Sequence, residues 1–176
     1  MQHIDLGATT QLAWVTRDME ASLNRFARDL GIGPWFVLPK AILPRTRFLG
    51  EPCEIEMIVA FANTCGLEFE MMQQTNAAPS IWSDGPAGDA LDALHHSCVR
   101  PPNYVAALTA ARAAGYAVEF EGETQRGHFS YVRKPGAATY VELLEDSPSR
   151  RAMHALVRDA AARWDGSDPV RPMPAV

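Results

Sequence analysis

The sequence predicts an α+β fold made of two copies of one strand–helix–strand unit, followed by a separate C-terminal helix. Short apolar segments with strand character, at residues 12–15 and from His96 onward, are each followed by an Ala-rich helical pattern. A glutamate inside a later strand, Glu70 or Glu142, then recurs near the end of each unit. A chain of 176 residues is long enough for two small halves that share one core.

The first unit begins with the strand at 12–15 and a helix that Asp18 caps at its N-terminus. The helix carries apolar residues at helical spacing and ends at Gly31. Segments 35–38 and 46–49 are predicted to form a strand and its continuation around a bend. Two further strands are expected at 54–62 and 66–73. Residues 75–92, rich in Ala, Pro, Ser, Gly and Asp, form the predicted linker, with Ile81 and Trp82 as its apolar anchors.

The second unit repeats this order. Alignment of Gln11 with His96 places Asp18 opposite Asn103, a second good N-cap residue. Later, residues 69–72 correspond to 141–144. Few residues are identical, so a chance likeness between two strand–helix units is the alternative. The recurrence of polar residues at equivalent positions favours a true repeat.

The pattern changes after Glu145. Residues 149–164 carry apolar side chains along one stripe, which predicts an amphipathic helix that covers the sheet or a subunit interface. The remaining residues, 165–176, hold three prolines and are expected to form a loose tail. We therefore divide the chain into a two-module domain at 1–147, with modules at about 8–75 and 93–147, and a C-terminal helix with its tail at 148–176.

Composition and charge indicate which classes of partner and which cellular compartment to expect. The net charge of −5 disfavours nucleic acid, which requires a basic surface. No apolar run approaches the roughly 20 residues that span a bilayer, and the first ten residues do not resemble a signal peptide. The odd set of Cys53, Cys65 and Cys98 lacks a C-x-x-C spacing and indicates free thiols. We expect a cytoplasmic protein with a small-molecule substrate and no membrane or nucleic-acid partner.

Four donor residues in a two-fold pattern, Gln11, Glu70, His96 and Glu142, can close around one divalent cation. Side chains alternate along a strand, so Glu70 shares a face with Glu68, and Glu142 shares one with Tyr140 and Leu144. A carboxylate in an apolar strand is costly unless it is paired or binds a metal. Each glutamate alone could instead be a solvent-facing strand residue.

Neighbouring residues on a strand face opposite ways, so His95 is expected to lie on the side away from His96. One imidazole and three oxygen donors suit Zn, Ni, Co, Mn or Mg. A non-haem iron dioxygenase would need two histidines and a carboxylate, whereas this donor set has one histidine.

A family resemblance rests on five motifs in order: Gln-x-Ala-x-x-x-x-Asp from Gln11, Leu-Gly-Ile-Gly-Pro-Trp, Phe-Glu-Met-Met, Leu-His-His and Val-Glu-Leu-Leu-Glu. Over roughly residues 10–147 the chain resembles the vicinal oxygen chelate superfamily, which includes glyoxalase I, methylmalonyl-CoA epimerase, extradiol dioxygenases and bleomycin-resistance proteins. The resemblance implies two βαβββ modules around a curved mixed-sheet cleft with a divalent metal on its floor, in a homodimer. Its ligand positions fall on Gln11, Glu70, His96 and Glu142, a set similar to that of glyoxalase I.

The resemblance also implies a chemistry. Glu56 matches the position of a catalytic glutamate in the epimerases, although it could simply be a polar residue at the sheet edge. Glu142 could act as both ligand and base, as in glyoxalase I. We predict a metal-dependent lyase or isomerase that moves a proton next to a carbonyl of a small organic or thioester substrate. The alternative is a metal-free small-molecule binding protein of the bleomycin-resistance kind. Candidate anion-binding residues are Arg45, Arg47, Arg100, Arg126 and Arg133.

Overall fold

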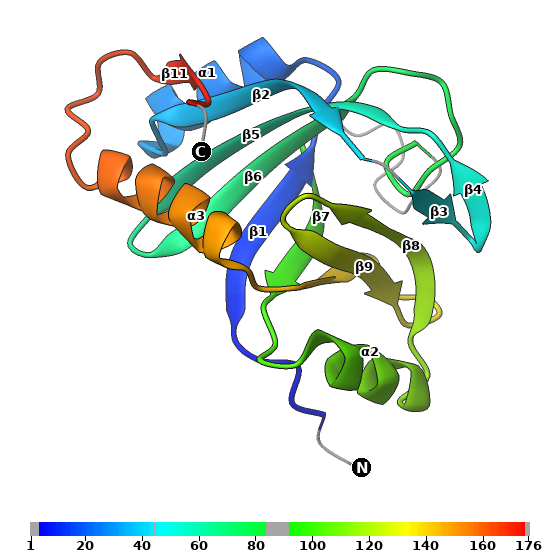
Figure 1. The fold of residues 1–176 in the computed structure, drawn as a ribbon. Helices are drawn as coiled ribbons and strands as arrows, with labels where there is room; N and C mark the ends of the chain where they lie inside the picture. Colours follow the sequence, from blue (N-terminus) through cyan, green and yellow to red (C-terminus); the bar gives the residue numbers. More distant parts are fainter. Residues whose placement is uncertain (1–3, 44, 84–91, 175–176) are drawn as a thin grey trace.

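One curved mixed sheet organises the protein in a computed structural model that describes residues 4–43, 45–83 and 92–174 (Figure 1). The described strands join in the order β11-β2-β5-β6-β1-β7-β10-β9-β8-β3-β4. The strands of the first half are β1 (Thr9–Val15), β2 (Trp35–Ile42), β3 (Thr46–Phe48), β4 (Glu51–Cys53), β5 (Glu56–Thr64) and β6 (Leu67–Gln74). Those that follow are β7 (Ala93–Val99), β8 (Ala117–Thr124), β9 (Gly127–Arg133), β10 (Tyr140–Leu144) and β11 (Val170–Pro172).

The predicted repeat is confirmed as two βαβββ modules. In each module the first strand pairs in parallel with the last, β1 with β6 and β7 with β10, while the other pairings within the module are antiparallel. The two first strands, β1 and β7, pair with each other in antiparallel fashion. The modules therefore meet along β1 and β7, and the four strands β6, β1, β7 and β10 form the centre of the sheet.

Helices α1 (Met19–Leu30) and α2 (Tyr104–Ala113) begin where the sequence predicts. The side chain of Asp18 accepts a hydrogen bond from the backbone of Ala21, and that of Asn103 accepts one from Ala106. Gly31 ends α1 at φ 65°, a left-handed conformation that glycine adopts at little cost. α1 packs with Ala60 and Ala62 of β5, whose side chains lie on the face opposite Val59 and Phe61. The face of the sheet that carries Val59 and Phe61 is therefore the concave, inner face.

The predicted continuation of β2 into 46–49 is wrong. Strand β3 instead leaves the first module, pairs with β8 of the second and is followed by β4 at the sheet edge. Only residues 43–45 separate β2 from β3, although these strands lie next to opposite edges of the sheet. So short a link forces the two edges towards each other, which accounts for the strong curvature visible in Figure 1.

The C-terminal segment lies against the first module. Helix α3 (Pro148–Ala161), capped by Ser147, places Met153 and Val157 in the same buried cluster as Val59 and Phe61. Figure 1 shows α3 crossing the sheet on the side opposite α1. The predicted loose tail contains β11, which pairs in parallel with β2, so that expectation is wrong for residues 170–172.

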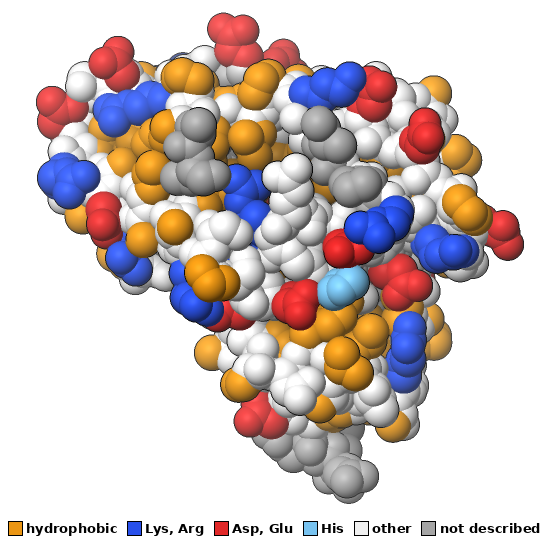
Figure 2. All heavy atoms as spheres, in the orientation of Figure 1, with side chains coloured by type: hydrophobic (Ala, Val, Ile, Leu, Met, Phe, Trp, Pro, Cys, Tyr) orange, Lys and Arg blue, Asp and Glu red, His pale blue; other side chains and the backbone are white. Residues whose placement is uncertain are grey.

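Part of the predicted linker packs against the core. Ile81 and Trp82 are almost completely buried, as expected of its apolar anchors, whereas residues 84–91 lie outside the described residues. Within the described ranges no helix has the length and apolar character needed to cross a membrane. On the face shown in Figure 2, acidic and basic side chains are interspersed, without a large area of one sign.

Candidate metal centre and cleft

Each of the four central strands carries one of the predicted donors. Glu70 lies on β6, Gln11 on β1, His96 on β7 and Glu142 on β10. Ala13 of β1 pairs with both Glu70 and His96, and Gln11 pairs with Cys98, which in turn pairs with Glu142. Paired residues in a sheet present their side chains on the same face. The four predicted donors therefore share the inner face of the curved sheet.

Three of these side chains converge closely. The Nε2 atom of His96 lies 3.4 Å from Glu70 Oε2 and 3.5 Å from Glu142 Oε2. These separations are long for hydrogen bonds. Two ligand atoms that share an ion at about 2.1 Å lie roughly 3 to 3.4 Å apart, so the spacing suits atoms arranged around a cation.

The site contains buried polar atoms that lack hydrogen-bond partners within the described structure. They include Gln11 Oε1, Glu70 Oε2 and His96 Nε2. Gln11, Glu70, His96 and Glu142 are each at most 7% exposed. A buried polar atom without a partner costs free energy, and a group of them on one face calls for a ligand. The donor set fits a divalent cation, although its role as a ligand set stays a prediction.

The expectation that His95 and His96 face opposite ways is wrong. The β1–β7 pairing passes from Ala13–His96 to Trp14–Leu94, so His95 is an extra residue in a bulge. The Nδ1 atoms of the two histidines lie 2.9 Å apart, and both residues are buried. The bulge thus brings the two rings into contact.

The contacts of His95 define the tautomer of His96. The carbonyl of Ile81 can only accept, so Nε2–H of His95 donates to it at 3.2 Å. Burial and the neighbouring His96 lower the pKa of His95 to about 3, so His95 is neutral and its Nδ1 is an acceptor. His96 must then donate from Nδ1, which leaves its Nε2 towards the two carboxylates. This is the arrangement of a metal-binding histidine oriented by a second residue.

The three converging groups have shifted proton affinities. Burial raises the pKa of Glu70 to about 7, against the influence of His96. Burial also disfavours ionisation of Glu142, but interaction with His96 outweighs it and lowers the pKa to about 2. Burial opposes the charged form of His96, yet the two carboxylates raise its pKa to about 9. Without a cation, the site therefore holds a proton near neutral pH that a metal would replace.

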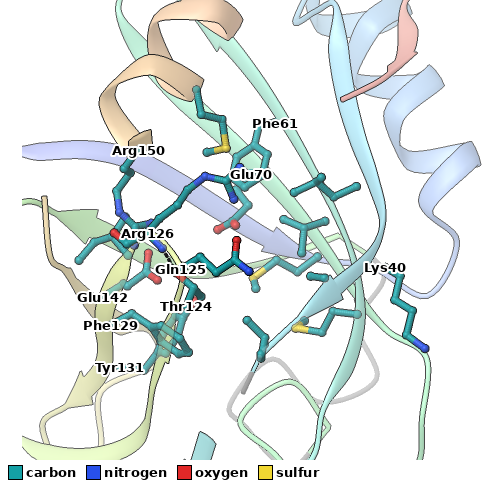
Figure 3. A pocket seen from close by; sticks show the side chains of 18 of the residues that line it. Lys40, Phe61, Glu70, Thr124, Gln125, Arg126, Phe129, Tyr131, Glu142 and Arg150 are labelled. Atoms are coloured by element: carbon teal, nitrogen blue, oxygen red, sulfur yellow. Dashed lines mark hydrogen bonds between the residues drawn. The ribbon is translucent and has the colours of Figure 1, made fainter. Parts of the chain in front are cut away.

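A mostly apolar cleft of about 340 Å³ lies above the two carboxylates (Figure 3). Its walls come from both modules, the linker and α3 and include Met57, Phe61, Met72, Trp82, Phe129 and Met153. Figure 3 shows Glu70 and Glu142 together on one side, with Arg126 and Arg150 nearby and Lys40 at the opposite end. The cleft can hold a small organic molecule with its polar end at the carboxylates.

Glu56 does not lie in this cleft. It begins β5 with an exposed side chain, and it alternates with Met57, whose side chain does line the cleft. Glu56 borders a separate hollow with Glu54 and Asn76. The structure therefore does not bring the epimerase-like glutamate next to the other predicted site residues.

Two residues of the site were missed. The orienting role of His95 depends on a bulge, for which the alternating pattern gives no signal. Arg150 lies in the first turn of α3, outside the two-module repeat, and lines the cleft beside Glu142. Of the predicted anion-binding arginines, only Arg126 lines this cleft.

Comparisons with known proteins agree with this architecture. The family profile of the Glyoxalase/Bleomycin resistance protein/Dioxygenase superfamily matches residues 10–132. The chain belongs to this superfamily. A search of the curated proteins finds no match.

Solved structures of this superfamily's fold are similar over most of the chain. Methylmalonyl-CoA epimerase from Mycobacterium tuberculosis has a TM-score of 0.57 at 12% identity, covering 86% of this chain and 97% of the epimerase. A selenomethionine methylmalonyl-CoA epimerase gives 0.53 at 18% identity, with 82% and 99% covered. A hypothetical protein from Bacillus halodurans gives 0.56 at 14% identity, with 80% and 94% covered. At these identities the likeness establishes the fold.

Proposed function

We propose that this superfamily member is a metal-dependent isomerase or lyase that moves a proton next to a carbonyl of a small organic or thioester substrate. The observation that carries this proposal is the convergence of the buried Glu70, His96 and Glu142, with Gln11 on the same face of the sheet, where both glutamates line an apolar cleft. Such a cleft excludes water around the polar end of a substrate and strengthens electrostatic interactions there.

Gln11, Glu70, His96 and Glu142 are the residues that would hold a divalent ion such as Zn, Ni, Co, Mn or Mg. When bound, the ion would polarise a substrate carbonyl and stabilise negative charge that develops on its oxygen. His95 keeps the His96 ring oriented through the Nδ1–Nδ1 contact. The side-chain oxygen of Gln11 has no hydrogen-bond partner among the described residues. This supports Gln11 as a ligand, because an amide binds a cation through its oxygen and not through its nitrogen.

Glu70 and Glu142 are the two candidates for the proton-transfer base, because both carboxylates line the cleft. Without a cation, burial raises the pKa of Glu70 to about 7, near the working pH, and a bound cation would lower it, so Glu70 is the first to test. The low pKa of Glu142 suits a carboxylate that stays ionised. Glu56, exposed on the opposite face of β5, is not part of this proposal.

Two features of the proposal rest on relatives. Two of the similar structures are named methylmalonyl-CoA epimerases, which supports an acyl compound as the substrate class. The superfamily resemblance supports a homodimer, and sedimentation at micromolar concentration would test it. A purely monomeric protein under those conditions would contradict this part.

Metal analysis of the purified protein tests the proposal. We expect about one divalent ion per chain in the wild type, its loss in His96→Ala, and its retention in His128→Ala, whose side chain is exposed. Full metal content in His96→Ala would contradict the assigned site. A wild type that binds small organic molecules without metal would favour the sequestering alternative.

Exchange of substrate protons in D₂O tests the chemistry. Across a panel of acyl-CoAs and hemithioacetals, the loaded protein should exchange the proton next to the carbonyl. Removing a positioned base slows such a step by about 100-fold to 10,000-fold, which we expect for Glu70→Gln. Unchanged exchange in Glu70→Gln, with slow exchange in Glu142→Gln, would move the base to Glu142.

A further inference from the structure

Arg150 is a buried cation on the wall of the cleft. It occupies the first turn of α3, is 7% exposed and lines the cleft beside Glu142 and Met153. Figure 3 shows it on the same side of the cleft as Glu142. Within the described part of the chain, no carboxylate oxygen lies within 4.0 Å of its guanidinium. A buried charge without an ion-pair partner is costly, so its presence calls for a reason.

Two backbone carbonyls hold the guanidinium in a fixed orientation. Its Nε donates to the carbonyl of Glu145 at 2.9 Å, and its Nη2 donates to that of Arg126 at 3.1 Å. A guanidinium has five N–H donors, so these two bonds leave both N–H groups of Nη1 and the second of Nη2. One N–H of Nη1 and the remaining N–H of Nη2 form the end-on edge of the guanidinium, which can bind two oxygens of one anion.

The carbonyl bonds alone do not explain the charge. Burial lowers the pKa of Arg150 from its ordinary value, with the charge of Glu142 acting against this. Glu142 is also directed at His96, 3.5 Å away, where the proposed ion would bind. The guanidinium therefore keeps a positive charge in the cleft that the described residues do not neutralise by direct contact.

We infer that Arg150 binds a carboxylate on the substrate, next to the substrate oxygens that face the proposed ion (Figure 3). The inference rests on the proposed function for the second contact and names the substrate class as a small organic acid with a separate carbonyl. A single guanidinium edge matches one carboxylate in shape and charge. A phosphate dianion would bring a second negative charge close to Glu70 and Glu142 in the same 340 Å³ cleft, whereas a carboxylate brings only one.

Binding of hexanoate and of its uncharged analogue hexanamide tests this inference on the protein as purified, by NMR titration. Arg150→Gln removes the charge, while its amide can still donate to one of the two carbonyls. A hydrogen bond to a charged group contributes about 1.5–3 kcal/mol, so hexanoate should bind roughly 10-fold to 100-fold more weakly to Arg150→Gln. Hexanamide should bind equally to both proteins. Arg151→Gln, an exposed neighbour paired with Asp146, should leave both ligands unaffected.

Arg150→Lys is the second variant, and it tests carboxylate binding by Arg150 if Arg150→Gln does not fold. Lysine keeps the charge but cannot form the end-on pair, so hexanoate affinity should fall by at least about 3-fold. Unchanged hexanoate affinity, or an equal loss for hexanamide, would overturn the inference. Metal content is measured on the same samples. If the wild type contains no metal but the Arg150 variants bind hexanoate more weakly, the result supports the role of Arg150 and contradicts the proposed function. If the wild type contains metal but the variants bind hexanoate as tightly as it does, the result contradicts the role of Arg150 and leaves the proposed function standing.

Discussion

A bulge in β7 places two neighbouring histidines on one side of the sheet and connects their rings. His95 donates to the carbonyl of Ile81 and accepts from His96, so His95→Phe keeps a ring against Trp82 but removes the acceptor. Loss of a residue that orients a ligand histidine commonly lowers metal affinity by about 10-fold to 100-fold. We expect this loss for His95→Phe in competition with a chelator. His128→Phe is the control, and equal affinities in the two variants would contradict the orienting role.

Metal binding should release protons from the site. At pH 7 the metal-free protein keeps His96 protonated, because the two carboxylates raise its pKa to about 9, and burial raises the pKa of Glu70 as well. The imidazole of His96 must lose its proton to act as a ligand, so at least one proton should leave per ion. Metal affinity should therefore rise as the pH increases from 5 to 9. Titration calorimetry in two buffers of different ionisation enthalpy measures the release, and none at pH 7 would refute this.

At the level of single residues, the sequence could predict that these four polar side chains share one face of the sheet, but not what surrounds them. Gln11, Glu70, His96 and Glu142 were predicted from alternation and repeat, because these patterns determine which face a side chain takes. A bulge breaks the alternation, and a residue outside the repeat has no counterpart to mark it. The contacts of His95, the place of Arg150 on the cleft wall and the position of Glu56 outside the cleft are therefore visible only in the three-dimensional structure.

Helix α3 fills one end of the cleft rather than projecting into solvent. Met153 is 3% exposed and packs in the same cluster as Phe61 and Met72. Met153→Ala should reduce the free energy of unfolding by about 2–5 kcal/mol, because it removes buried methylenes and leaves a cavity. Urea denaturation measures this loss. Arg158→Ala, exposed on the same helix, should change stability by no more than about 0.5 kcal/mol. A similarly small effect for Met153→Ala would contradict the tight packing of this side chain against Phe61 and Met72.

Elements with local signals were predictable, and those that depend on distant partners were not. The caps Asp18 and Asn103 mark helix starts through side-chain bonds to nearby backbone, which the sequence contains. Strands β3 and β11 pair with β8 and β2, far from them in the chain. Three-residue strands have too little periodicity to reveal such pairings. The curvature of the sheet follows from the short link between β2 and β3, so it could not be predicted from the sequence either.

At the scale of the whole molecule, the proposed ion would join the two modules. Glu70 and Gln11 belong to the first module, His96 and Glu142 to the second, and β1–β7 pairing is the backbone contact between their first strands. An ion that binds only the folded protein stabilises it by about 2.7 kcal/mol at 100 times its dissociation constant. For a chain of this size, each kcal/mol raises Tm by about 2–4 °C.

Saturating metal should therefore raise the Tm of the chelator-treated wild type by roughly 5–11 °C in a calorimetric scan. His96→Ala should lose this increase, because it removes the imidazole from the junction of the modules. His128→Ala should keep it, since this exposed side chain lies outside the donor set. An equal increase in wild type and His96→Ala would place the stabilising ion elsewhere. No increase in the wild type would contradict the proposal that Glu70 and Glu142 bind a cation.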